Sequence, residues 1–286
     1  MKKILLATDF SERSDRALRR ASLLAREFGA ALSIVHVVDD DQPRRIVDSE
    51  RKAASTLLLE MQRTLRDSDG IACETRVVLA DPFIGIARAA EEEAPDLLVI
   101  GPHRRRLLRD VFVGTTAERT IRAVSCPVLM VNAPPVGAYR QVMLSVDMSE
   151  GAEAATRTAL DLGLAAQSEL SFLHVYHAPA AGLAMSNTMP TEDRDSYLGE
   201  QRKEAERALA QFVKRTGVRS AHQLVRFGLH TPADEILDAA RDAKADLVVV
   251  GTESRSGIAK FFLGSVAEAV LRAAECDVLA VPRAAG

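Results

Sequence analysis

A loop near the carboxyl end of the chain has the residue types of a phosphate cradle. Gly251 directly follows the apolar run 246–250, and Gly264-Ser265 precedes the last predicted helix. The amino terminus of a helix has unpaired N–H groups and the positive end of the helix dipole, so it suits a phosphate. The other candidate contacts of this loop are Thr252, Ser254, Arg255 and Val266.

Two more candidate residues lie at predicted strand ends in the same part of the chain. Asp147 can accept a hydrogen bond from an adenine amino group or a ribose hydroxyl, and the backbone of Val175 can meet a base edge. In an open parallel sheet, ligands bind beyond the carboxyl ends of the strands, which is where these residues fall. The alternative is that Asp147 only caps a helix and the glycines only turn the chain. The residues alone leave both interpretations open.

The chain contains an internal repeat. "KKILLATDFSERSDRAL" (2–18) matches "RQVMLSVDMSEGAEAAT" (140–156), which aligns Asp9 with Asp147. "FVGTTAERTIRAVSCPVLMV" (112–131) matches "FLGSVAEAVLRAAECDVLAV" (262–281). The second copy is longer, and composition predicts a loop insertion at 178–193. The segment 132–139, stiffened by Pro134-Pro135, is the predicted linker between domains 1–133 and 138–286.

Strands and helices alternate in each copy. The first copy has predicted strands at 4–8, 32–37, 75–79, 97–100 and 128–131, and predicted helices at 11–28, 50–67, 83–93 and 115–124. Ser11 caps the first helix and Gly29 ends it, and the pairs Asp81-Pro82 and Thr231-Pro232 begin later helices. Continuous apolar strands between helices indicate an α/β fold, a doubly wound open parallel sheet with helices on both faces.

Composition excludes several classes of protein. The 286 residues have a formal net charge of -3 and 47% hydrophobic residues, so neither a nucleic-acid partner nor disorder is expected. No apolar run is long enough to span a membrane, and we expect a cytoplasmic protein. The three cysteines are widely spaced and are interpreted as small core residues. No metal-ligand spacing and no catalytic nucleophile with an adjacent base recurs in both copies, so neither a metal site nor a catalytic residue is predicted.

The repeated segments and the loop of Gly251 and Gly264-Ser265 resemble the universal stress protein family, in its tandem two-domain form. The resemblance covers essentially the whole chain. The resemblance implies five-stranded sheets ordered 3-2-1-4-5. It also implies ATP, with or without Mg²⁺, held by the residue after strand one, the backbone near the end of strand two and the glycine loop. The fifth strands, 128–131 and 278–281, would pair antiparallel across a pseudo-two-fold axis. The chain would thus be an intramolecular pseudo-dimer, and a further homodimer is compatible with this arrangement.

Both copies depart from the family pattern of Gly, two residues, Gly, nine residues and Gly-Ser or Gly-Thr. The second copy has Ser254 at the middle position, and the first copy has Arg104. If that position needs a positive φ, a non-glycine residue costs about 1–2 kcal/mol. A micromolar ATP site represents about 8 kcal/mol, so this cost weakens binding by about ten- to thirtyfold without abolishing it. The second copy is therefore the stronger candidate. The weaker candidates in the first copy are Asp9, Val37, Gly101, His103, Arg104, Arg105, Gly114 and Thr115.

Other features of the first copy have more than one interpretation. The basic stretch "GPHRRRLLRD" (101–110) can bind an anion, fill its own pocket or form a solvated loop. His36 and His174 precede the proposed base-contacting valines, so alternation points them to the opposite face, where we interpret them as structural hydrogen-bonding residues.

The leading hypothesis is a stress-response or signalling protein that binds ATP or a related adenine nucleotide chiefly in its carboxyl-terminal domain, without efficient catalysis. Two alternatives remain. One is a nucleotide-independent adaptor that binds a protein partner, since Pro102, Arg104 and Ser254 degrade both loops. The other is a slow ATPase, for which the sequence shows no base that would position a water molecule.

Overall fold

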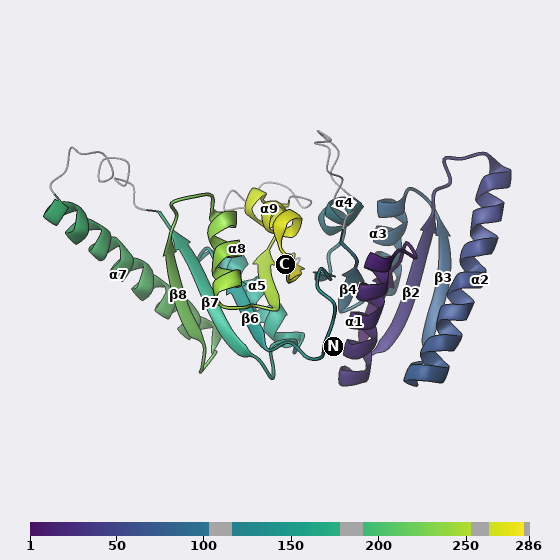
Figure 1. Ribbon diagram of the computed structural model, residues 1–286, viewed down its shortest axis with the longest axis horizontal. Coiled ribbons are helices and arrows are strands. Elements are labelled where there is room, and N and C mark those ends of the chain that lie inside the picture. The colour runs from purple at the N-terminus through teal and green to yellow at the C-terminus, as the bar shows by residue number, and fades with distance from the viewer. Residues whose placement is uncertain (103–115, 178–190, 253–262, 283–286) are drawn as a thin grey trace.

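The computed structural model of the chain describes residues 1–102, 116–177, 191–252 and 263–282. The first half of the chain forms the right side of Figure 1. Its elements are β1 (Lys3–Ala7), α1 (Glu12–Phe28), β2 (Ala31–Val38), α2 (Arg44–Asp69), β3 (Cys73–Leu79), α3 (Pro82–Glu93), β4 (Leu97–Ile100), α4 (Thr116–Ala123) and β5 (Val128–Met130).

The second half repeats this order of elements on the left side of the figure. Its elements are β6 (Gln141–Ser145), α5 (Glu150–Asp161), β7 (Glu169–Tyr176), α7 (Thr191–Thr216), β8 (His222–Phe227), α8 (Pro232–Asp242), β9 (Leu247–Gly251), α9 (Ser265–Ala273) and β10 (Asp277–Val281).

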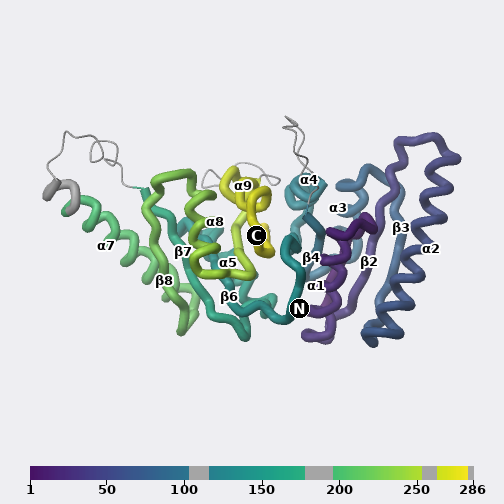
Figure 2. The backbone as a smooth tube through the Cα atoms, viewed as in Figure 1, coloured from purple at the N-terminus to yellow at the C-terminus, as the bar shows by residue number. Residues whose placement is uncertain are grey.

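All strands described join one ten-stranded sheet in the order β3-β2-β1-β4-β5-β10-β9-β6-β7-β8. The two halves therefore have the order 3-2-1-4-5 that the sequence resemblance implied. The pairings within each half are parallel, whereas β5 and β10 pair antiparallel at the centre, with Leu129 opposite Leu279. Figure 2 shows the two halves side by side, and the β5–β10 pairing joins them into one sheet. The predicted pairing of the fifth strands is thus confirmed.

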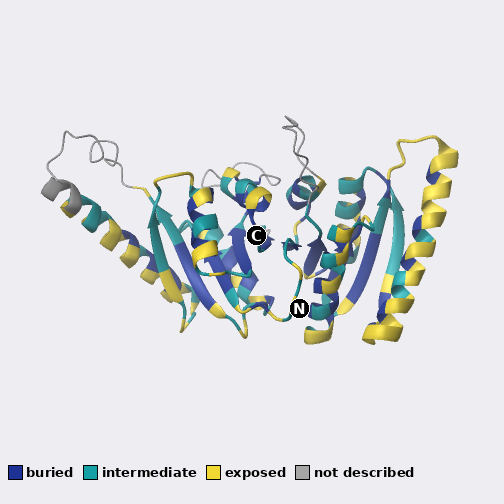
Figure 3. Ribbon diagram, viewed as in Figure 1, coloured by how far each residue is buried: buried dark blue, intermediate teal, exposed yellow. Residues whose placement is uncertain are grey.

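Alternation along the strands separates two apolar layers. Leu6, Ile34 and Phe172 lie on one face with residues of α1, α2, α5 and α7, and Leu5, Val35 and Leu173 lie on the other with residues of α3, α4, α8 and α9. Figure 3 shows the buried strands between helices whose outer surfaces are exposed. Helices cover both faces, as the apolar strand sequences predicted.

The helix signals of the sequence are mostly confirmed. The hydroxyl of Ser11 accepts a hydrogen bond from the Ser14 N–H at the start of α1, and Gly29 ends the helix at φ 60°. Asp81 and Thr231 cap α3 and α8, each directly before the proline that begins the helix.

Two predicted boundaries were wrong. The helix α2 begins at Arg44 rather than at residue 50, because Val47 buries its side chain with Val38 and Ala54 in a small core of its own. The helix α7 begins at Thr191, so the last residues of the predicted 178–193 loop are helical. The rest of that insertion, 178–190, lies outside the described residues.

The cysteine prediction was only partly right. Cys73 is buried, but Cys126 and Cys276 are partly exposed, and none of the three forms a disulfide. Burial raises the pKa of both Cys126 and Cys276 to about 11, so these thiols stay protonated near neutral pH.

A buried polar network joins the two halves and the linker at Asp277, the first residue of β10. Its carboxylate, fully buried, accepts hydrogen bonds from Arg20 Nε at 3.2 Å and from the Tyr139 hydroxyl at 2.6 Å. It also accepts the backbone N–H groups of Asn132 at 2.9 Å and Ala133 at 3.0 Å. The Arg20 guanidinium lies over the Tyr139 ring at 4.1 Å. Helix α1, the linker and β10 are thereby held together.

Reciprocal ion pairs connect α4 with α9. Arg122 donates to Glu268 at 2.7 Å, and Arg272 donates to both carboxylate oxygens of Glu118 at 2.6 and 3.1 Å. Arg122 and Arg272 occupy matching positions of the repeat, as do Glu118 and Glu268, so the two pairs follow the pseudo-two-fold axis.

Candidate functional site

A crevice of about 530 Å³ opens at the carboxyl ends of the strands in the second half. All predicted residues of this half that the structure describes line it, and they come from the ends of β6, β7 and β9 and from the start of α9. They are Asp147, Val175, Gly251, Thr252, Gly264, Ser265 and Val266. Ser254 and Arg255 lie outside the described residues. The structure therefore brings together residues that are far apart in the sequence, as the strand-end rule for open sheets requires.

The amino terminus of α9 faces this crevice without a side-chain cap. Gly264 is the N-cap and has no side chain to accept from the first turn, and Ser265 and Val266 line the crevice beside it. The first N–H groups of a helix need an outside acceptor, and an anion at this end also meets the positive end of the dipole. The backbone is fixed here by hydrogen bonds from Gly264 N–H to Thr252 O at 2.8 Å and from Thr252 N–H to Val281 O at 3.0 Å.

Asp147 shapes the turn that leads into α5. One of its oxygens accepts the Ser149 N–H at 3.0 Å and the Ser149 hydroxyl at 2.6 Å, and that hydroxyl in turn accepts the Ala152 N–H at the helix start. Met148 between them has a positive φ of 66°. Asp9, Phe10 (φ 58°) and Ser11 repeat this turn. Asp147 thus supports a helix cap, as one interpretation of the sequence held, and it also lines the crevice.

Sequence reasoning missed several lining residues. Glu150 in the first turn of α5 and His177 after β7 put a carboxylate and an imidazole at the exposed mouth of the crevice. The His177 ring covers Gly228, where a Cβ atom would lie 2.3 Å from it. The presence of Gly228 is the signal that could have located this contact, since a glycine at a strand end marks a close approach.

A second, smaller crevice of about 330 Å³ lies at the equivalent place in the first half. Asp9, Val37 and Gly101, three of the weaker candidates, line it. The remaining candidates of this half, His103, Arg104, Arg105, Gly114 and Thr115, lie outside the described residues, as does most of the basic stretch.

The glycines that end β4 and β9 differ in the space around them. A Cβ atom on Gly101 would lie 3.0 Å from the backbone oxygen of Arg13, whereas one on Gly251 would meet, among the described residues, only the Ala155 Cβ at 3.7 Å. We expect Gly101→Ala to lower the free energy of unfolding by about 1–3 kcal/mol, because backbone atoms must move. Gly251→Ala, the matched variant, should change it by less than about 0.5 kcal/mol. Urea titrations of both variants test this difference, and equal losses would contradict it.

His36 in β2 and His174 in β7 are hydrogen-bonded to the ends of the neighbouring strands. His36 Nδ1 lies 2.8 Å from Thr8 O, and His174 Nδ1 lies 3.0 Å from Val146 O. Both thus have the structural hydrogen bond that was predicted. His36 lies on the face opposite to Val37, as alternation predicted, because its ring stacks on Phe10 of one apolar layer whereas Val37 packs against the other.

The burial of His36 makes the free energy of unfolding depend on pH. Burial lowers the pKa of His36 below its ordinary value of 6.5, although the Thr8 carbonyl opposes the shift. The unfolded chain therefore takes up a proton before the folded chain does, and stability is lost as pH falls below about 6.5. We expect His36→Asn to reduce the loss in free energy of unfolding between pH 7.5 and 5.5, measured by urea titration. His222→Asn, at an exposed position of β8, should leave the loss unchanged. An unaltered pH dependence in His36→Asn would refute this assignment.

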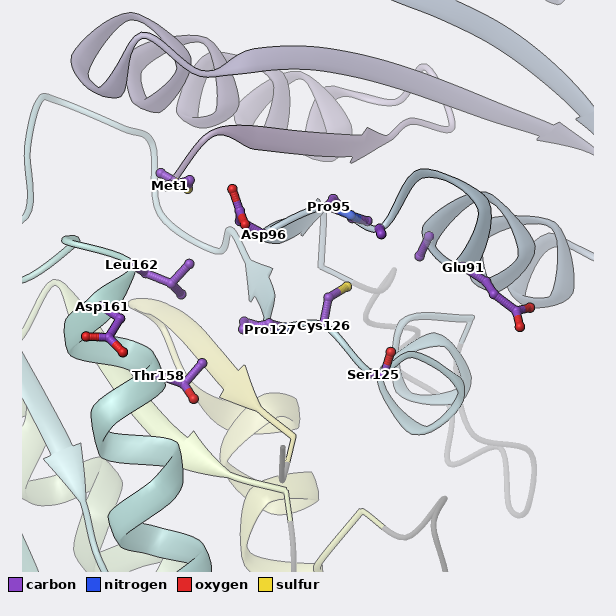
Figure 4. A pocket seen from close by; sticks show the side chains of 12 residues that line it. Met1, Glu91, Pro95, Asp96, Ser125, Cys126, Pro127, Thr158, Asp161 and Leu162 are labelled. Carbon is purple, nitrogen blue, oxygen red and sulfur yellow. The ribbon is translucent and has the colours of Figure 1, made fainter. Parts of the chain in front are cut away.

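A further hollow of about 500 Å³ lies at the opposite, amino-terminal edge of the strands, between the two halves. Figure 4 shows Asp96, Cys126 and Pro127 on one side of it, and Thr158 and Asp161 of α5 on the other. The Asp96 carboxylate already accepts the backbone N–H groups of Lys2 and Lys3. The hollow lies away from the strand ends where open sheets bind ligands, so it is not our candidate site.

Within the described ranges, no cluster of three or more His, Cys, Asp or Glu residues could hold a metal ion. None of the helices in these ranges has the length and apolar content that crossing a bilayer requires.

Comparison with known proteins agrees with this architecture. A model described as the Universal stress protein family matches the chain twice, at residues 1–132 and 138–282. A universal stress protein of Mycolicibacterium smegmatis is 26% identical over 97% of this chain and 96% of its own length. Universal stress protein E of Escherichia coli is 25% identical over 97% of this chain and 93% of its own length.

Solved structures share the fold across both halves. A functionally unknown protein of Pseudomonas aeruginosa matches with a TM-score of 0.72 and 21% identity over 99% of this chain and 93% of its own. A universal stress protein of Archaeoglobus fulgidus matches with a TM-score of 0.69 and 20% identity over 98% of this chain and 96% of its own.

Proposed function

Since the chain belongs to the universal stress protein family, whose role lies in stress responses, we propose that it binds ATP or a related adenine nucleotide in the crevice of its second half. The uncapped amino terminus of α9 is the observation that carries this proposal. The N-cap Gly264 supplies no side-chain acceptor for the first N–H groups, and Ser265 and Val266 line a crevice of about 530 Å³. A phosphate supplies the acceptor and the negative charge that this helix end favours.

The rest of the crevice suits an adenine ring and its sugar. Val175, Ile236 and Val250 contribute apolar surface, and the backbone of Val175 lies at the end of β7, where it can meet a base edge. Asp147 and Ser149 provide oxygen atoms on the opposite side, next to α5. An apolar cleft with few convergent polar groups is the usual form of a small-molecule site.

Calorimetric titration of the full chain with ATP, with and without Mg²⁺, tests the proposal. We expect one binding event per chain in the micromolar to submillimolar range and a rise in melting temperature with ATP concentration. Adenosine should bind more weakly than ATP, because it lacks the phosphates. Absence of heat and of any shift in melting temperature at millimolar ATP would overturn the proposal and favour the nucleotide-independent adaptor.

Slow hydrolysis is a second candidate, because the structure adds groups that the sequence did not reveal. Glu150 and His177 line the mouth of the crevice, where a carboxylate or imidazole can accept a proton from water. Phosphate release from ATP should then fall in Glu150→Gln or His177→Asn while ATP binding persists. Release that is the same in these variants as in the parent chain would leave binding as the only role of the crevice.

A further inference from the structure

The crevice of the first half differs in chemistry from that of the second. Matching positions of the repeat place Arg13 where the second half has Gly151, Ser14 where it has Ala152 and Thr120 where it has Val270. Arg13, Ser14 and Thr120 all line the first-half crevice, which has about 330 Å³ against about 530 Å³. The first-half crevice is therefore smaller and has less apolar surface than the second-half crevice, and it has a charged donor and hydroxyl groups in its lining.

In the described part of the chain, two polar atoms of these side chains are buried without a hydrogen bond, although the Arg13 side chain as a whole is 35% exposed. Among the described residues, Arg13 Nε and the Thr120 hydroxyl oxygen have no hydrogen bond, and Thr120 has no exposed surface at all. A buried polar atom without a partner costs free energy, so its retention calls for an explanation such as a bound ligand. Ser14 differs in this respect, because its hydroxyl is bonded to Thr8 and to the Ser11 carbonyl.

The surroundings of Arg13 favour an anionic ligand. Among the described residues its guanidinium has one loose ion pair, with Asp9 at 3.8 Å, and the Asp9 side chain is mostly exposed. Thr116 and Ala117, in the first turn of the eight-residue helix α4, line the crevice as well and add the positive end of a helix dipole. Guanidinium groups bind phosphate and carboxylate oxygens strongly, since the hydrogen bonds are charge-assisted.

We infer that the first-half crevice is a separate site for a small anion, a molecule with one phosphate or carboxylate group that Arg13 and Thr120 hold. The smaller volume separates this ligand from the nucleotide proposed for the second half. The chain would then respond to two different small molecules, one in each half. This inference does not rest on nucleotide binding in the second half.

The test uses the full chain and two probes, inorganic phosphate and acetate. Each is titrated while the Arg13 Nε–H signal is followed by ¹H–¹⁵N NMR and the melting temperature is measured. We expect one of the probes to shift this signal saturably and to raise the melting temperature. Phosphate acting alone would identify a phosphate ligand, and acetate acting alone would identify a carboxylate ligand.

The variants Arg13→Gln and Thr120→Val remove the two donors, and the valine is the type found at the matching position of the second half. We expect Arg13→Gln to weaken binding by roughly 10- to 100-fold and Thr120→Val by about tenfold. Arg19→Gln, on the same helix, should bind as the parent does. Gly251→Glu, which blocks the second-half crevice, should also bind as the parent does, and this separates the inference from the nucleotide proposal. Equal binding by the parent and Arg13→Gln, or no response to either probe, would overturn the inference.

Discussion

Replacing Asp277 with alanine should lower the free energy of unfolding by about 3–5 kcal/mol. This carboxylate has no exposed surface, and its hydrogen-bond partners come from α1 and the linker. Its loss leaves the guanidinium of Arg20, itself only 4% exposed, without its counter-charge. A buried charge that loses its partner is among the most costly effects of a single substitution.

Asp277→Ala should disrupt more than the ion pair between Asp277 and Arg20. Burial and the adjacent carboxylate raise the pKa of Tyr139, so its hydroxyl stays protonated and donates to Asp277. Asp277→Ala removes the acceptor for this hydroxyl and for the backbone N–H groups of Asn132 and Ala133. We therefore expect loosening at the linker and at the β5–β10 pairing.

Urea titration followed by circular dichroism measures this effect, and amide hydrogen exchange at Asn132 and Ala133 locates it. Asp242→Ala is the control, since Asp242 is largely exposed in its ion pair with Arg226 and its loss should cost at most about 1 kcal/mol. If Asp277→Ala were no more destabilising than this control, Asp277 would not be what holds the halves together.

The network at Asp277 is a part of the structure that could not be predicted from the sequence. Apolar periodicity and helix caps are local signals, so the sequence predicted the alternation of strands and helices, whereas the family resemblance implied the strand order and the central pairing. At the position that matches Asp277 the first copy has Pro127. The comparison of the two copies therefore gave no reason to single out Asp277. Its partners Arg20 and Tyr139 are far away in the sequence, and only the folded chain brings them together.

The sequence also predicted only part of the candidate site. Asp147, Val175 and Gly251 follow apolar strands directly, and the geometry of a parallel sheet makes such residues converge. Glu150 and His177 follow no such rule, because a helix turn and a loop of this fold direct them to the crevice. The unpaired atoms Arg13 Nε and Thr120 Oγ1 in the described part of the chain were also missed, because the sequence does not show which polar atoms meet in the fold.

Filling the second-half crevice at Gly251 should abolish nucleotide binding while the fold is kept. Gly251→Glu places a carboxylate at the end of β9, beside the start of α9, where the proposed phosphate meets the helix. The new side chain takes up space and repels the phosphate, so we expect ATP affinity to fall by roughly 100-fold or more. At an ATP concentration of about 100 times the parent's Kd, a stabilisation of about 2.7 kcal/mol should then largely disappear.

The local structure explains why the variant should still fold. Among the described residues, a Cβ atom at Gly251 has only the Ala155 Cβ within 4 Å, at 3.7 Å, and a carboxylate near the amino terminus of α9 interacts favourably with the helix dipole. Gly199→Glu, at a helix position with open space around it, carries the same change of charge away from the crevice and should keep full ATP binding. Gly251→Ala separates bulk and charge from the loss of glycine itself, and should bind ATP nearly as the parent does. If Gly251→Glu still bound ATP with the parent's affinity, the nucleotide would have to lie outside this crevice, whereas a parallel loss in Gly199→Glu would point to net charge rather than to the site.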